Sequence, residues 1–136
     1  MNNGLHVRVR AGGEHYALPV AGVREIAPLG QITPVPGAPA AILGVWNLRG
    51  DVIAAIDLAR LLGLQSEAEP SRIVVGEDGT VRAGLVVESV IDVGALPEAL
   101  EPADSEFLSA AALIDREPVG VIDLGAVLAA GGGRDE

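Results

Sequence analysis

The sequence predicts an all-β fold, built as two small antiparallel barrels that share an apolar seam, and three observations lead to this prediction. Apolar and polar residues alternate strictly along Leu5–Arg10, which is typical of a strand with one buried face. Further short apolar runs follow, separated by turns that contain glycine. The same order of elements then begins again after residue 70. A chain of 136 residues has room for one compact unit, or for two small barrels with a common core.

The chain begins with a hairpin and an irregular segment. Gly12 and Gly13 form the turn after the first strand, and His15–Val20 continues as a second extended segment. Val23–Ile26 is short and mixed in character, and it is predicted to form a helical turn. Gln31–Pro39 contains three prolines. Because proline removes a donor from the strand ladder, this stretch is predicted to be irregular or to lie at a sheet edge.

A second hairpin and a short helix follow. The apolar runs Ala41–Arg49 and Val52–Ile56 flank a two-residue turn that begins at Gly50. The side chain of Asp57 is predicted to cap the first amide groups of a short helix, which Gly63 ends.

Beyond residues 65–70, the most linker-like stretch of the chain, the pattern resumes. We predict strands at Ser71–Val75, Val81–Glu88 and Val119–Ile122, a turn at 77–79, a turn-like piece at Val90–Val93 and an acidic loop at Glu101–Ser105. Asp123 is predicted to cap a last helix that runs toward Ala130. Residues 131–136 are predicted to form a disordered tail.

An internal repeat relates the two halves of the chain. Residues 17–23 match residues 84–90 at an offset of 67, and Ile-Asp-Leu at 56–58 recurs at 122–124. Each half is too small to be comfortably stable alone. We therefore expect a duplication, with a first barrel half at 5–64 and a second at 71–128 in one domain over 5–128. A strand from one half could complete the other, and a groove would lie between them.

Composition excludes several classes of partner. Nine basic and nineteen acidic residues give a formal net charge of −10, and aromatic residues make up only 2% of the chain. Nucleic acid and anionic membrane surfaces would be repelled, and stacking platforms are scarce. The absence of cysteine excludes disulfides and thiolate sites. No export signal and no apolar run of ~18 residues is present, so a cytoplasmic protein without membrane insertion is predicted.

Motifs for catalysis or cofactor binding are missing from the sequence. The two histidines lack metal-ligand spacing, no serine lies in a Gly-x-Ser-x-Gly elbow, and no glycine-rich phosphate motif occurs. Asp57 and Asp123 hold equivalent positions in the repeat and could be paired acids, but helix capping explains both. We predict no enzymatic activity, no cofactor and no metal. A small ligand-binding barrel is the alternative.

Arg49 is the candidate binding residue that the pattern itself indicates. It follows a run that is apolar except for Asn47, and it lies at the predicted hairpin tip. A guanidinium held on a rigid turn suits a partner's carboxylate or backbone carbonyls. A solvated turn arginine is the equally weighted alternative.

The segment GVWNLRG at 44–50, followed by VIAAIDL at 52–58, resembles the core motif of the CheW-like domain family. Three other stretches resemble further family segments in the same order: Tyr16–Ile26, Ile32–Pro36 and Gly84–Val93. The resemblance spans roughly Leu5 to Leu128. It implies two tandem SH3-like five-stranded barrels with short terminal helices.

The resemblance also implies a function. It implies a non-enzymatic adaptor that couples the cytoplasmic tip of a chemoreceptor, a methyl-accepting chemotaxis protein, to the regulatory domain of a CheA-type histidine kinase. The receptor-facing groove would then involve Val23, Glu25, Ile26, Asn47, Arg49, Val90 and Val93. A similar adaptor in a non-chemotactic two-component pathway, such as surface motility, is the alternative.

Overall fold

The computed structural model describes residues 4–65 and 68–131. Within them the strands are β1 (Leu5–Ala11), β2 (Glu14–Pro19), β3 (Val23–Pro28), β4 (Ile42–Leu48), β5 (Asp51–Asp57), β6 (Arg72–Asp78), β7 (Val81–Val87), β8 (Ser89–Ala95), β9 (Leu108–Ile114) and β10 (Glu117–Ile122). The helices are the 3-10 turn η1 (Val20–Gly22), α1 (Leu58–Leu61) and α2 (Leu124–Gly131).

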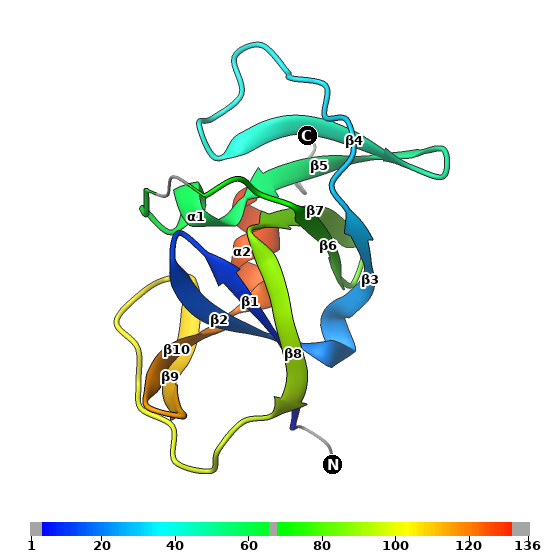
Figure 1. Cartoon of the computed structure of the whole chain (residues 1–136). Helices are drawn as coiled ribbons and strands as arrows, with labels where there is room; N and C mark the ends of the chain where they lie inside the picture. Colours follow the sequence, from blue (N-terminus) through cyan, green and yellow to red (C-terminus); the bar gives the residue numbers. More distant parts are fainter. Residues whose placement is uncertain (1–3, 66–67, 132–136) are drawn as a thin grey trace.

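The strands form two five-stranded sheets, which confirms the predicted all-β architecture (Figure 1). Barrel 1 has the strand order β3-β6-β7-β5-β4, and barrel 2 has the order β8-β1-β2-β10-β9. Barrel 1 lies in the upper part of Figure 1 and barrel 2 in the lower part, with α2 between them.

Each barrel takes strands from both sequence repeats. The hairpin β1–β2 joins β8, β9 and β10, while its counterpart β6–β7 joins β3, β4 and β5. The match extends to pairing, because β10 runs parallel to β2 just as β5 runs parallel to β7. The segments 5–64 and 71–128 therefore mark the repeat units and do not coincide with the two barrels. Reciprocal exchange of the hairpins ties the units together.

Two segments predicted as turns are edge strands. Val23–Ile26 belongs to β3, which pairs with β6, and Val90–Val93 belongs to β8, which pairs with β1. Each partner strand is distant in sequence, so short local patterns gave no sign of the pairing. The sequence reading also missed β9, where an alanine-rich run becomes extended through its pairing with β10.

The turns of two hairpins are shifted by one or two residues from their predicted positions. The β4–β5 turn is at Arg49 and Gly50, so that Asp51 already belongs to β5. The β6–β7 turn is at Gly79 and Thr80, which leaves residues 77 and 78 in β6. In both hairpins a glycine with positive φ supplies the reversal.

Both predicted helix caps are present. The backbone N–H of Arg60 donates to Oδ1 of Asp57 at 3.2 Å, and that of Ala126 donates to Oδ1 of Asp123 at 3.2 Å. Helix α2 extends to Gly131, one residue into the predicted tail. The rest of that tail, and residues 66–67 of the predicted linker, lie outside the described residues.

Two apolar clusters stabilise the fold. The central core joins the two barrels and α2, and comprises Val7, Val9, Ala11, Tyr16, Leu18, Ile56, Leu58, Val74, Ala83, Leu85, Val87, Ile122, Leu124, Val127 and Leu128. The barrel 1 core fills the interior of that barrel with Trp46, Leu48, Ile53, Ala55, Ile73, Val75 and Val86. Burying each large aliphatic side chain contributes about 1.5–3 kcal/mol. Since residues from both repeats share the central core, the barrels are expected to fold together.

Candidate functional site

The predicted site residues Glu25 and Arg49 form a two-pronged ion pair. Nη1 of Arg49 donates to Oε1 of Glu25 at 2.8 Å, and Nη2 donates to Oε2 at 2.7 Å. Parallel hydrogen bonds of this kind fix the orientation of the guanidinium plane. The Arg49 side chain nevertheless remains 71% exposed, and that of Glu25 is 26% exposed. The pair is therefore both ordered and accessible to a partner.

The backbone at the hairpin tip places this arginine. Arg49 has φ = +50°, and Gly50 follows with φ = +92°. The side-chain Oδ1 of Asn47 accepts a hydrogen bond from the backbone N–H of Gly50 at 2.9 Å, which stabilises the tight reversal. The Asn-Leu-Arg-Gly sequence thus builds a turn that holds one guanidinium in place.

The same ion pair closes barrel 1. Strands β3 and β4 are the two edges of their sheet, yet Glu25 on β3 reaches Arg49 at the tip of the β4–β5 hairpin. The sheet must curl for these side chains to meet. Hydrogen bonding to the Glu25 carboxylate raises the pKa of Arg49 above its ordinary value, with a smaller Coulombic contribution from the same carboxylate.

The apolar site residues lie on the two equivalent edge strands, β3 and β8. Val23 and Val90 are half-buried and pack against the central core. Ile26 is 39% exposed and Val93 is 56% exposed. The structure therefore brings Glu25, Asn47 and Arg49 together at one edge of barrel 1, and it leaves Val93 on the edge of barrel 2.

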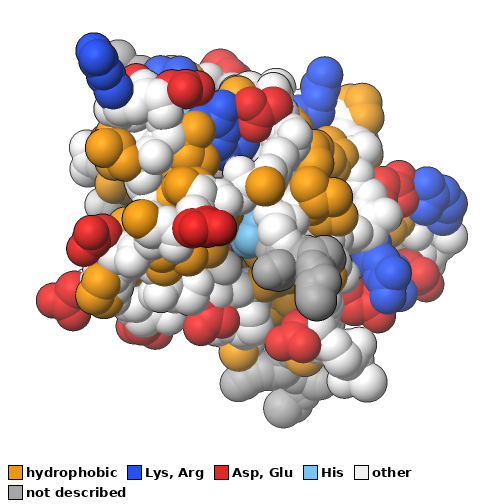
Figure 2. Space-filling view, turned by 90° about the horizontal axis from the view of Figure 1, so that it is seen from below, with side chains coloured by type: hydrophobic (Ala, Val, Ile, Leu, Met, Phe, Trp, Pro, Cys, Tyr) orange, Lys and Arg blue, Asp and Glu red, His pale blue; other side chains and the backbone are white. Residues whose placement is uncertain are grey.

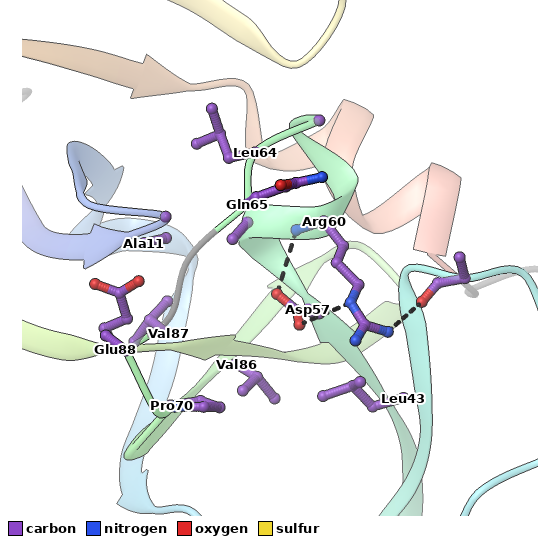
Figure 3. Close-up of a pocket in the computed structure, with 15 residues that line it drawn as sticks. Ala11, Leu43, Asp57, Arg60, Leu64, Gln65, Pro70, Val86, Val87 and Glu88 are labelled. Atoms are coloured by element: carbon purple, nitrogen blue, oxygen red, sulfur yellow. Dashed lines mark hydrogen bonds and ion pairs between the residues drawn. The ribbon is translucent and has the colours of Figure 1, made fainter.

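A cavity of about 750 Å³ lies elsewhere, beside α1 (Figure 3). Its walls include Ala11 from the β1–β2 hairpin, Leu43 from β4 and Glu88 after β7. On the helix side, Nε of Arg60 is 3.6 Å from Oδ2 of Asp57, and its Nη1 donates to the carbonyl of Ala40 at 3.4 Å. Sequence reasoning did not predict this cavity.

The repeat produces a second cavity of about 520 Å³ at the start of α2. Asp123 and Gly125 line it where Asp57 and Ala59 line the first. The matching offsets of the two helix starts were the only indication of such a pair in the sequence. Both cavities follow from the same packing of a short helix against a barrel end.

Exposed apolar side chains extend over both barrels. Large ones on barrel 1 and its loop are Ile26, Val35 and Val52, and on barrel 2 and its flanking loop they are Leu5, Ile91, Val93, Leu100 and Leu113. Figure 2, which views the molecule from below, shows apolar groups spread among carboxylates on that face. Aliphatic side chains scattered among charged groups are ordinary on protein surfaces, so this mixture does not by itself mark a contact surface.

The described residues contain no group of three or more His, Asp or Glu side chains placed to hold a metal ion. Within the same residues, no helix has the length and apolar character needed to cross a membrane. At the edge of barrel 1 the structure therefore combines an ordered ion pair, a rigid turn and, on β3, the exposed side chain of Ile26.

The fold and this motif define a family of signalling domains. Residues 6–131 match the model of the CheW-like domain. The chain belongs to the CheW-like domain family. A solved structure, the scaffolding protein TtCheW from Thermoanaerobacter tengcongensis, superposes with a TM-score of 0.84 at 30% identity, covering 91% of this chain and 86% of that one.

Curated relatives agree with this assignment. The chain is 30% identical over 131 residues to a probable chemotaxis protein CheW of Rhizobium etli, covering 89% of this chain and 84% of that protein. It is 37% identical over 90 residues to the chemotaxis protein CheW of Rhizobium meliloti, which covers 64% of this chain and 57% of that protein. Protein FrzA of Myxococcus xanthus is 34% identical over 93 residues, with 66% and 58% covered. The match thus spans less than two thirds of two of these relatives.

Proposed function

We propose that this chain is a non-enzymatic, cytoplasmic adaptor that links the cytoplasmic tip of a chemoreceptor to a CheA-type histidine kinase. Membership of the CheW-like domain family supports the proposal. The observation that carries it is the exposed Glu25–Arg49 ion pair on a rigid hairpin turn, because a fixed guanidinium suits a helical partner that presents carboxylates or backbone carbonyls.

The receptor-facing surface in this proposal comprises Val23, Glu25, Ile26, Asn47, Arg49, Val90 and Val93. Val23 and Val90 sit at equivalent places on the two edge strands, where each packs on the central core. They would form the apolar floor of the surface, while Arg49 would stand at its rim. The regulatory domain of the kinase would bind elsewhere on the barrels, so that both partners could be held at once.

A charge reversal tests the role of the arginine. In Arg49→Glu, the variant carboxylate faces Glu25, so the guanidinium contact to the receptor is lost and the local charge changes sign. We expect binding of a soluble chemoreceptor tip fragment to weaken by ~1–3 kcal/mol, roughly 5- to 150-fold, in a calorimetric titration. The melting temperature should change little, because exposed ion pairs contribute only about 0–1 kcal/mol.

Arg60→Glu is the matched control, since Arg60 is also an exposed arginine paired with a carboxylate, but it lies beside α1. Its affinity for the tip fragment should equal that of the wild type. Equal affinity of Arg49→Glu and wild type would remove Arg49 from the surface. Failure of the wild-type chain to bind any chemoreceptor tip, together with binding to a receptor of another two-component pathway, would favour the non-chemotactic alternative.

A further inference from the structure

The interior of barrel 2 buries smaller apolar side chains than the interior of barrel 1. Four buried apolar residues belong to neither the central core nor the barrel 1 core, and they are Ala17, Ala112, Val119 and Val121. All four lie on β2, β9 and β10, on the faces opposite the central core. The buried apolar side chains on this face of barrel 2 are therefore alanine and valine, where barrel 1 has Trp46 and three isoleucine or leucine residues.

The repeat shows which residue of barrel 2 is equivalent to each residue of barrel 1. The strand registers match position by position, since Glu25 pairs with Val75 in barrel 1 and Asp92 pairs with Arg8 in barrel 2. By the same correspondence Ala112 stands in the place of Trp46, because each is opposite the equivalent residue of the neighbouring strand.

A small open pocket lies between β1, β8 and the end of β9 in barrel 2. It measures about 80 Å³, and its lining residues are His6, Arg8, Ala17, Asp92, Gly94, Ala95, Leu96 and Ile114. Near it, Nδ1 of His15 is buried without a hydrogen-bond partner. Small side chains and an unpaired buried nitrogen make this interior less stabilising than that of barrel 1.

The edges of barrel 2 also lack the ion pair that closes barrel 1. Arg49 and Asp115 occupy equivalent hairpin tips with nearly identical backbone angles, φ = +50° and +51°. The residue equivalent to Glu25 is Asp92, so acidic groups hold both positions in barrel 2, and Arg8 supplies the positive charge near them: its pKa is raised by the hydrogen bond to Asp92 and by Coulombic attraction to Asp92 and Asp115. Asp92 instead accepts two hydrogen bonds from Arg8 on the adjacent strand, at 3.0 and 2.7 Å.

The place where the two edge strands of one barrel face each other is called its seam, and it lies between β3 and β4 in barrel 1 and between β8 and β9 in barrel 2. In one respect the two seams are alike. A loop residue bridges to the outer edge of each barrel, Thr33 to Val45 and Glu101 to Ala111. The ion pairs do differ: among those of the described residues, none links β8 to the β9–β10 hairpin, whereas Glu25–Arg49 links β3 to the β4–β5 hairpin.

We infer that the seam between β8 and β9 opens through detachment of these edge strands from β1 and β10, and that this local unfolding is far more frequent than detachment of β3 and β4 from β6 and β5 in barrel 1. Because β8 carries Val90 and Val93, a partner that binds this strand would hold the seam closed. This second part rests on the proposed function. The coupling follows from mass action, since a ligand that binds only the closed form lowers the population of the open form.

Amide hydrogen exchange of the free wild-type chain tests the seam, with barrel 1 as an internal control. Amides of β8 and β9 should exchange roughly tenfold or more faster than those of β3 and β4 that hold equivalent positions. Equal protection at equivalent positions would overturn the inference. No partner is needed for this measurement, so its outcome is independent of the proposed function.

Two variants place the seam residues of one barrel at the equivalent positions of the other. The pair Arg8→Val and Asp115→Arg copies Val75 and Arg49 into barrel 2, and should slow exchange in β8 and β9 toward the barrel 1 rates. Arg49→Asp copies barrel 2 into barrel 1, and should speed exchange in β3 and β4. If either variant fails to fold, the other still decides, and unchanged rates in a folded variant would count against the inference.

A chemoreceptor tip fragment tests the second part. Saturating fragment should slow exchange in β8 and β9 more than in β3 and β4. Binding without a change in β8 and β9 would overturn the coupling but leave the adaptor function intact. A fragment that does not bind would contradict the adaptor function, while the exchange rates of the free chain would still decide whether the seam opens.

Discussion

At the scale of single residues, glycine and arginine define the site more than the apolar residues do. Arg49 and Gly50 both have positive φ, and the side chain of Asn47 bonds the backbone between the strands. This short segment thus supplies the turn, the hydrogen bond that stabilises it and the exposed guanidinium. The turn geometry by itself therefore accounts for the asparagine and the glycine of the motif.

Gly44, which begins the same motif, is required for close packing of the backbone. It has φ = +150°, and a Cβ at this position would overlap the carbonyl group of Thr33 on the bridging loop. We expect Gly44→Ala to destabilise the fold by more than about 1 kcal/mol, because alanine is strained at this φ and its Cβ would meet backbone atoms. Urea denaturation measures the change in the free energy of unfolding.

Gly94→Ala is the matched control, because a Cβ there would meet no atom within 4 Å. Gly94 lies in β8, where alanine should be neutral or slightly stabilising. A Gly44→Ala variant as stable as the Gly94→Ala variant would show that the loop can move away from the motif at little cost.

At the scale of elements, equivalent caps begin two helices of unequal length. Asp57 caps the four-residue α1, whereas Asp123 caps the eight-residue α2, three residues of which lie in the central core. Each cap satisfies an amide that would otherwise lack a partner at the helix start. Tertiary contacts, rather than helix propensity, hold such short helices in place.

Removing either cap should lower stability without changing the fold. We expect Asp57→Ala and Asp123→Ala each to cost about 0.5–2 kcal/mol in the free energy of unfolding, measured by chemical denaturation. Asp57→Ala should cost more than its cap alone, because it also removes the carboxylate near Arg60. Replacement by Asn, which retains a capping oxygen, should restore most of the loss in Asp123. Equal losses for Ala and Asn would rule out capping as the reason.

At the scale of the whole molecule, ion pairs join strands that are distant in sequence. Arg8 bonds Asp92 between β1 and β8, and Arg24 bonds Glu77 between β3 and β6. The guanidinium hydrogen bonds hold the pKa of both carboxyl groups below their ordinary values, and partial burial opposes the effect. Each pair connects one sequence repeat to the other.

These shifts predict a loss of stability in acid. A carboxyl group whose folded-state pKa lies below its unfolded value stabilises the fold above the unfolded pKa, and that contribution disappears as the pH falls through the folded pKa. The melting temperature should therefore decrease as the pH drops below about 4. In Asp92→Asn, the melting temperature at pH 7 should be lower than in the wild type, and its further decrease in acid should be smaller.

Glu98→Gln, in the loop after β8, is the control for this experiment. It removes one negative charge without breaking either ion pair, and so it accounts for the relief of repulsion in a chain of net charge −10. If Asp92→Asn and Glu98→Gln had the same pH profile, the Arg8–Asp92 pair would contribute nothing to acid stability.

The sequence allowed the fold class, the repeat and the two helix caps to be predicted, because each rests on local patterns. Alternation identified β1, and the recurring Ile-Asp-Leu segments located both helix starts. It did not reveal the edge strands β3 and β8, since these depend on partners far along the chain, or the strand β9, whose alanine-rich run lacks a clear strand pattern. The contact between Glu25 and Arg49 could not be predicted from the sequence either, although both residues were predicted to belong to the site.

By itself, the sequence determined that this protein consists of two related β units with an unusual arginine at a hairpin tip. Only the tertiary structure decided how the units combine. Hairpins are exchanged between the repeats, because β1 and β6 each pair with an edge strand of the other unit. That exchange places Val75 beside Glu25 in one barrel and Arg8 beside Asp92 in the other. The first barrel is closed across its seam by Arg49, whereas in the second the acidic group is bound within the sheet. The reason is that burial and charge pairing act between strands that adjoin in space, whatever their separation along the chain.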